Sequence, residues 1–231
     1  MVLFAFIRGW FVCFGFGAAN PSLFAVKNSA KMDLVIFDLE TTGFSPRWHD
    51  IIQIAAVRLR GGRTPGETFS TYVRPRCPVP ESITDLTGIT DADVADAPGT
   101  PDALRAFARF VAGENGRENT TLLAHNGHRF DMRFIAESCA QHGLPTCPVR
   151  FIDSIWLSKK CWPAESLHNL DVIVERLGID PGATGHRRHD ARADVHLLAN
   201  AVRRMIQNLF PVASAKRLKA ETCEHDFVAA A

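Results

Sequence analysis

Two acids, Asp38 and Glu40, directly follow the apolar run Leu34–Phe37, and this arrangement constrains the fold more than any other feature of the chain. The apolar run predicts a buried strand. Side chains at i and i+2 of a strand point to the same face, so the two carboxylates would lie side by side. Like charges in that position are destabilising unless a positive charge lies between them. A divalent cation with oxygen ligands, Mg²⁺ or Mn²⁺, supplies that charge; two solvated acids at a strand end are the alternative.

The composition is that of a globular protein with one domain and extensions. The chain has 231 residues, of which 46% are hydrophobic and 22% are charged, with a formal net charge of +1. Residues 1–32 carry three basic and no acidic side chains, which leaves 23 basic and 25 acidic side chains on residues 33–231. A protein that grips long duplexes through phosphates is usually more basic, so we expect any contact with nucleic acid to be short and helped by metal. The six cysteines form no C-x-x-C pair, which favours a reducing, cytoplasmic compartment.

The first 32 residues differ from the rest. Residues 2–19 are apolar and rich in Phe, with Arg8 inside the run. A signal peptide carries its charge before the apolar core, and a charge inside a membrane span is costly, so we expect no stable membrane association. Three interpretations stay open: Met32 is the true start, residues 1–31 form a disordered or weakly membrane-active leader, or they form a signal or anchor. We therefore divide the chain into an N-terminal extension (1–32), a main domain (33–210) and a loose C-terminal tail (211–231).

The main domain alternates between strand and helix patterns. We expect strands near 34–37, 51–60, 67–74, 120–124 and 149–153, and helices at 100–112, 130–142, 166–177 and 190–209. Short links join the first three strands, which predicts an antiparallel meander. The later strands alternate with helices, which predicts parallel pairing. The fold class is therefore α/β, with a mixed five-stranded sheet flanked by helices.

Three further acids and a histidine stand at or near element boundaries. Asp131 falls in the first turn of an expected helix, where it can act as a metal ligand or simply favour the helix dipole. Asp190 is the natural N-cap of the last helix and needs no catalytic role. Asp194 lies one turn into that helix on its apolar side, where an acid is costly unless it is paired or bound to metal. His189 precedes the helix in a loop, where imidazole can titrate near neutral pH.

Three motifs taken together resemble the DEDD exonuclease superfamily in its histidine-type branch, over about residues 33–210. They are D-x-E-T-T-G at 38–43, His-Asn followed by Phe-Asp within 125–131, and H-x-A-x-x-D at 189–194. The family's second motif usually has two residues between Asn and Phe, whereas three separate Asn126 from Phe130 here. The tyrosine branch places Tyr four residues before the last acid, and that position is Asp190 in this chain.

The resemblance implies a ribonuclease H-like fold and a 3′→5′ exonuclease that releases 5′-mononucleotides by a two-metal mechanism. It assigns two divalent cations, Mg²⁺ or Mn²⁺, to four acids, and the role of general base to His189. It also implies that the turn after the first acids and Asn126 contact the substrate. The acids are Asp38, Glu40, Asp131 and Asp194, and the residues of the turn are Thr41, Thr42, Gly43 and Phe44.

The sequence says less about substrate and partners. Residues 81–90 resemble a segment of the proofreading subunits of bacterial replicative polymerases, which favours single-stranded DNA 3′ ends over RNA. An RNA-trimming exonuclease of the same fold is the first alternative, and a non-catalytic polymerase-docking or nucleic-acid-binding module is the second. A DNA polymerase is a candidate partner because a proofreading role would require one. A sliding clamp is another, because residues 207–210 faintly resemble a clamp-binding peptide, although they better suit the end of a helix.

Overall fold

The computed structural model describes residues 3–7, 10–14, 33–62, 64–114, 116, 119–184, 189–209 and 222–229. The chain forms two compact units, Met1–Lys31 and Met32–Ala231. In the first unit, β1 (Leu3–Ile7) and β2 (Trp10–Phe14) pair as an antiparallel hairpin. Among the described residues, no helix is both long enough and apolar enough to cross a bilayer. The division of the chain at residues 32 and 210 stays a prediction.

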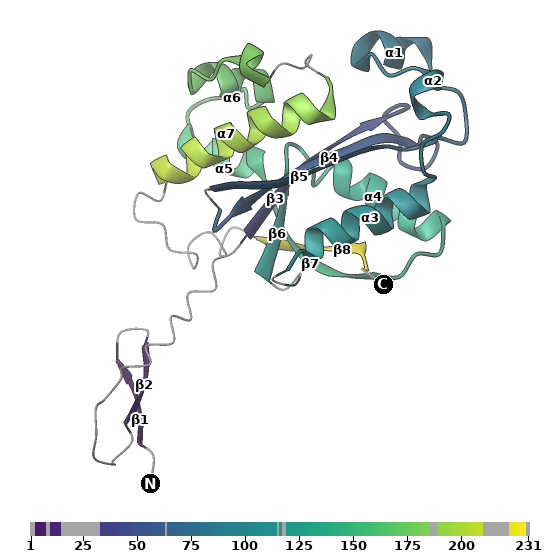
Figure 1. The fold of residues 1–231 in the computed structure, drawn as a ribbon. Helices are drawn as coiled ribbons and strands as arrows, with labels where there is room; N and C mark the ends of the chain where they lie inside the picture. Colours follow the sequence, from purple (N-terminus) through teal and green to yellow (C-terminus); the bar gives the residue numbers. More distant parts are fainter. Residues whose placement is uncertain are drawn as a thin grey trace. The chain divides into compact units, whose positions relative to one another are not determined.

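The second unit is built on a six-stranded sheet with the order β5-β4-β3-β6-β7-β8 (Figure 1). β3 (Asp33–Thr41), β4 (Ile51–Arg60) and β5 (Thr64–Tyr72) form an antiparallel meander. β6 (Thr120–Ala124) pairs parallel with β3, and β7 (Thr146–Asp153) pairs parallel with β6. β8 (Cys223–Val228) closes the edge antiparallel to β7. The predicted α/β class with a meander followed by parallel strands is confirmed.

Helices cover both faces of the sheet (Figure 1). One face carries α5 (Ser154–Cys161), α6 (Leu170–Arg176) and α7 (Ala191–Leu209). The other carries α3 (Thr100–Ala112) and α4 (Asp131–Gln141). The short helices α1 (Glu81–Thr87) and α2 (Asp91–Val94) pack with Ile52 in a small separate cluster, and η2 (Pro181–Thr184) precedes α7.

Successive side chains of β3 point to opposite faces of the sheet, and this decides which helical layer each of them contacts. Leu34 and Ile36 pack in the core beneath α7, whereas Val35, Phe37 and Leu39 pack in the core beneath α3 and α4. Asp38 and Glu40 continue the first series with a period of two, so their side chains lie on the α7 side. The strand thus ends with two acids on its α7 face, where the apolar core stops.

The structure contains elements that the sequence analysis did not predict, namely β8, α5 and the short helices α1 and α2, and the helix predicted at 166–177 begins only at Leu170. The sheet has six strands instead of five, because Cys223–Val228 forms β8 within the segment assigned to a loose tail. This strand is short and follows a polar stretch, and it is stabilised by pairing with β7, which local patterning does not reveal. The helix α5 was also not predicted, because it begins directly at the end of β7 with no intervening loop. The rest of the predicted tail, apart from residues 222–229, lies outside the described residues.

Candidate active site

Three carboxylates meet at the end of β3. Asp38, Glu40 and Asp194 each place an oxygen so that all three ligand atoms lie within 4.8 Å of one another. Asp38 and Glu40 are half-buried and Asp194 is buried. Asp194 follows Glu40 by 154 residues in the chain (194 − 40), so the cluster is a product of the tertiary fold. Three of the four predicted metal ligands are therefore brought together.

Gln53 on β4 helps to set the start of α7 over this strand end. Gln53 lies directly opposite Glu40 in the β3–β4 pairing and is buried. Its Oε1 accepts a hydrogen bond from the Ala191 backbone N–H (3.0 Å), and its Nε2 donates to Asp190 Oδ1 (3.4 Å). The Asp190 carboxylate also accepts from the Arg192 N–H at 2.9 Å, as expected for the first turn of a helix. These bonds fix the first turn of α7, and Asp194 lies in that turn.

Asp131 lies beside the cluster but makes a different contact. It is the first residue of α4 and is 2% exposed. Its Oδ1 accepts a hydrogen bond from the Leu39 backbone N–H at 3.2 Å, at a position of β3 beyond the last residue paired with β6. Burial raises the pKa of Asp131 to about 7; the backbone N–H groups of Asp131 and Leu39 oppose this rise, and Asp153 adds to it. The fourth predicted ligand is thus held against the backbone between the two strand acids.

Asp153 was missed by sequence reasoning although it organises the neighbouring turn. It is the last residue of β7 and the N-cap of α5, where its Oδ1 accepts from Ile155 N at 3.0 Å. The same carboxylate accepts from Asn126 N (3.0 Å) and His128 N (3.1 Å). An aspartate one residue before Ser-Ile-Trp is an N-cap signal that could have revealed the helix. Its bonds to Asn126 N and His128 N hold the segment that leads from β6 to Asp131, and its bond to Ile155 N ties that segment to the start of α5.

The turn after the strand acids is a closed, hydrogen-bonded loop. Thr41 Oγ1 donates to Gly43 O at 2.6 Å, and Thr42 exchanges bonds with the backbone of Asp50 at 2.9 Å in both directions. Both threonine side chains are buried. A Cβ on Gly43 would lie 2.3 Å from the His49 ring, so this glycine is required by close packing within the loop. Residues 41–43, which were predicted to contact the substrate, therefore stabilise the loop itself through their hydrogen bonds and close packing.

Phe44 and Trp48 project from this loop into solvent. Their exposed fractions are 82% and 74%, so neither is a core residue. From the sequence, Phe44 was placed among the residues that contact the substrate, and Trp48 was not included. Arg47 lies over the Trp48 ring at 5.3 Å from its centroid. Exposed aromatic rings beside a carboxylate cluster offer stacking surfaces for bases.

Asn126 and His189 both have left-handed backbone conformations, with φ of 57° and 61°. Asn126 is exposed and its carbonyl accepts from Arg129 N and Phe130 N, both at 3.1 Å, so the extra residue before Phe130 is absorbed in a tight turn. His189 is exposed and immediately precedes the cap of α7. Its role as a base stays a prediction, because residues 185–188 of its loop lie outside the described residues.

The donor set of the cluster fits a hard divalent cation. Carboxylate oxygens from a strand and a helix lie within 4.8 Å of one another, and such oxygens are the ligands that Mg²⁺ and Mn²⁺ prefer. Bringing three carboxylates together in a partly buried place is costly unless positive charge compensates them. The arrangement can therefore hold a cation that would in turn bind a phosphate.

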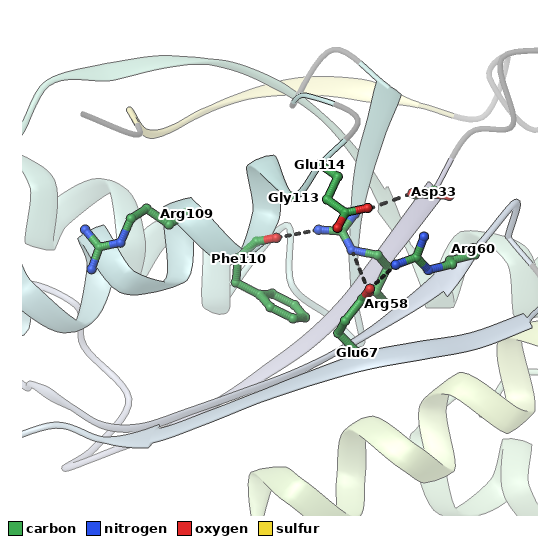
Figure 2. Close-up of a pocket in the computed structure, with 8 residues that line it drawn as sticks. All are labelled: Asp33, Arg58, Arg60, Glu67, Arg109, Phe110, Gly113 and Glu114. Carbon is green, nitrogen blue, oxygen red and sulfur yellow. Dashed lines mark hydrogen bonds and ion pairs between the residues drawn. The ribbon is translucent and has the colours of Figure 1, made fainter.

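A second cluster of charges lies at the opposite end of β3, around a hollow of about 240 Å³ (Figure 2). The buried Arg58 guanidinium lies 3.7 Å from Asp33 Oδ2 and 3.5 Å from Glu67 Oε2. It also donates to the carbonyls of Phe110 and Val111 at the end of α3. Because its partners are acids on the sheet and carbonyls at the end of α3, the Arg58 guanidinium joins the sheet to α3, and the cluster has a structural role.

Comparison with known proteins agrees with this geometry. The family model described as exonuclease matches residues 35–202. A Rhodobacter capsulatus protein named DNA polymerase III subunit epsilon-like protein is 37% identical over 196 residues, which cover 84% of this chain and 26% of that protein. A Streptococcus pneumoniae DNA polymerase III PolC-type is 33% identical over 178 residues, or 75% of this chain and 12% of that protein. The chain thus spans about a quarter or less of these relatives.

Solved structures share the fold. The nuclease domain of 3′hExo, a DEDDh family member bound to rAMP, has a TM-score of 0.65 and 25% identity, covering 76% of this chain and 92% of that one. Exonuclease X in complex with 5′ overhanging duplex DNA has a TM-score of 0.61 and 24% identity, covering 81% and 98%. The resemblance found in the sequence motifs is confirmed by the family match.

Proposed function

The chain belongs to the exonuclease family whose model matches residues 35–202, and from that premise we propose that it is a metal-dependent 3′→5′ exonuclease. Its substrates are single-stranded nucleic-acid ends, DNA in preference to RNA, and its products are 5′-mononucleotides. The observation that carries the proposal is the meeting of Asp38, Glu40 and Asp194 within 4.8 Å. The names of the polymerase III relatives support a DNA substrate and a role in proofreading or repair.

Two divalent cations, Mg²⁺ or Mn²⁺, would be held by Asp38, Glu40 and Asp194, with Asp131 assisting directly or through water. When bound, they supply charge neutralisation at the phosphate and at the leaving oxygen, and a more acidic attacking water. Asp131 orients the end of β3 through its bond to Leu39 N, which keeps the two strand acids aimed at one point. Phe44 provides a face on which the terminal base stacks.

His189 would accept the proton of the attacking water on an imidazole nitrogen. Its support is its position five residues before Asp194 at the start of α7. Replacing His189 by Ala should lower kcat by about 10²–10⁴-fold while leaving Mn²⁺ affinity near the wild-type value. Single-turnover digestion and Mn²⁺ titration of the same preparation measure the two quantities. A wild-type rate for the variant would remove His189 from the mechanism.

The test of the function is digestion of matched 5′-labelled DNA and RNA oligonucleotides. We expect stepwise shortening from the 3′ end with Mg²⁺ or Mn²⁺, none with EDTA, and a faster rate on DNA. Asp194→Asn should lose activity, whereas Asp85→Asn, which removes an exposed acid on α1, should keep it. Digestion that persists in EDTA contradicts the metal mechanism, and a faster rate on RNA identifies the trimming alternative instead.

A polymerase is the partner that the named relatives suggest, and we include such an association in the proposal. Gln207 to Leu209 form the end of α7, which favours the helix-end interpretation of the clamp-like peptide, and Phe210 lies outside the described residues. Affinity capture from a native lysate tests the association. Recovery of neither a polymerase nor a sliding clamp favours a free-standing nuclease.

A further inference from the structure

A second group of metal-ligating side chains meets apart from the carboxylates. His128, Cys223 and His225 place one ligand atom each within 4.8 Å of one another. His128 lies in the turn before α4, and the other two lie on β8. The exonuclease reaction proposed above uses none of the three side chains.

The fold explains why these residues meet. Cys223, His225 and Phe227 alternate on β8, so they share the face on which Phe227 is buried beneath α3 and α4. The β8–β7 register places Cys223 opposite Phe151 and His225 opposite Val149. His128 is the middle of the three residues between Asn126 and Phe130, one more than the usual two of the family motif. The extra residue and the added edge strand thus supply the cluster together.

We propose that His128, Cys223 and His225 form a second metal site that binds Zn²⁺, with water in the fourth position. Two imidazoles and a thiolate suit Zn²⁺ and disfavour the hard Mg²⁺ that suits the carboxylates. His128 Nδ1 and His225 Nε2 are 2.9 Å apart. Two nitrogens on one tetrahedral Zn²⁺, each at about 2.0–2.1 Å, lie about 3.3 Å apart, so a small rotation of the exposed His128 ring admits the ion.

The His128 and His225 rings share a hydrogen bond. Burial raises the pKa of Cys223, since the thiolate is poorly solvated there, and Asp153 adds to the rise. A metal ion that binds this sulfur must displace the thiol proton. Zn²⁺ does so and Mg²⁺ does not. The donor atoms therefore select the metal by their chemistry as well as by their spacing.

The ion would join the edge strand to the turn that precedes Asp131. His128 N is already bonded to Asp153, and the His128 ring lies 5.6 Å from Trp156 at the start of α5. Together with Asn126, these residues line a hollow of about 180 Å³. A Zn²⁺ bound to both β8 and this turn would fix the His128 side of the hollow to the edge strand. With three protein ligands and one water, this site would be separate from the cations used in hydrolysis.

The test uses Co²⁺ as a spectroscopic substitute for Zn²⁺ on the full-length, metal-stripped chain in excess Mg²⁺. A Co²⁺–thiolate bond gives a charge-transfer band that carboxylate ligands cannot give, so the readout does not depend on nuclease activity. We expect one equivalent of Co²⁺ per chain to produce the band and one equivalent of Zn²⁺ to abolish it. Cys223→Ser should lose the band, whereas Cys77→Ser, which removes an exposed thiol from a loop, should keep it.

His128→Ala is the second variant, because His128 is exposed and its removal should leave the fold intact. We expect it to weaken Co²⁺ binding by more than the about 10–100-fold that loss of an outer-shell partner costs. Zn²⁺ should also raise the thermal midpoint of the wild-type chain and not that of either ligand variant. No thiolate band in the wild type, or a band of unchanged affinity in both Cys223→Ser and His128→Ala, would overturn the site.

Discussion

Both ends of β3 carry acids, but the charges around them differ. At the first residue, Asp33 lies beside the Arg58 guanidinium, which also contacts Glu67 and the end of α3 (Figure 2). At the far end, Asp38 and Glu40 meet the carboxylate of Asp194. Asp33 and Asp38 are five residues apart, which is about 17 Å along the strand. The cluster around Arg58 contains charges of both signs and so stabilises the fold. The cluster of Asp38, Glu40 and Asp194 contains only negatively charged carboxylates and so suits a cation.

The comparison gives the two clusters opposite signatures in experiments. Removing a charge from the mixed cluster should lower stability, because its former partner is left buried without it. Removing an acid from the carboxylate cluster should lower activity and metal affinity with little loss of stability, because like charges are then fewer. The largest expected effect belongs to the carboxylate end.

Asp38→Asn should reduce kcat by more than the about 10²–10⁴-fold that loss of a general base costs, since both proposed cations depend on Asp38. Asn keeps the size of the side chain but loses the charge. Single-turnover digestion of a labelled oligonucleotide at saturating Mg²⁺ measures the effect. The thermal midpoint of wild type should also rise with Mg²⁺, and that of the variant should rise less.

The matched control is Asp33→Asn on the same strand. Its Oδ1 accepts from Gly61 N at 2.9 Å, a bond that an Asn side-chain oxygen can keep, while the charge beside Arg58 is lost. We expect this variant to be less stable and to retain a kcat close to wild type. Equal losses of kcat in both variants would show that the two ends are not functionally distinct.

Arg58→Met should cost about 3–5 kcal/mol of unfolding free energy, the range for breaking a buried ion pair from one side. Burial lowers the pKa of Arg58, and the charges of Asp33 and Glu67 oppose that effect, so the guanidinium depends on these partners. Urea denaturation measures the loss. Arg60→Met is the control, because Arg60 pairs with Glu67 at a half-exposed position where an ion pair contributes little to stability.

The carboxylate end was more predictable from sequence than the mixed end. Asp38, Glu40 and Asp194 interrupt apolar periodicity, and an acid in a core-facing position is a signal that a single sequence carries. Arg58 lies in an equally apolar strand, yet its partners Asp33 and Phe110 come from segments whose pairing only the fold reveals. Nothing local distinguishes Arg58 from a solvated residue at a strand end.

Among the helices and strands too, those marked by local sequence signals were predicted and those that depend on distant contacts were not. The predicted bounds of β4, β6 and α3 match the structure, because the Gly61-Gly62 turn and Pro101 at the first turn of α3 mark their ends locally. β8 depends on β7 for its hydrogen bonds, and α5 begins without a break after it. Both are therefore decided by contacts distant in sequence, and so is the meeting of His128 with Cys223 and His225.

The two ends of β3 also differ in their aromatic side chains, and this difference concerns substrate binding. Replacing an aromatic residue should have the smallest effect of the changes considered. At the mixed end, the half-buried Phe110 ring packs 5.4 Å from the Arg58 guanidinium carbon. At the carboxylate end, Phe44 is 82% exposed and touches little of the protein. A ring that contributes little to folding is free to stack on a base, which is worth about 1–3 kcal/mol.

Phe44→Ala should therefore weaken binding of a single-stranded oligonucleotide by about 5- to 150-fold, the affinity equivalent of that stacking energy. Its unfolding free energy should stay within about 0.5 kcal/mol of wild type, because the side chain is exposed. Fluorescence anisotropy with the Asp38→Asn background measures binding without digestion. Leu167→Ala removes another exposed apolar side chain, 59% exposed and outside the loop at 42–50, and should change neither quantity. If Phe44→Ala binds as tightly as its background, the exposed ring is not a substrate contact, and Trp48 becomes the next ring to replace, since it projects from the same loop.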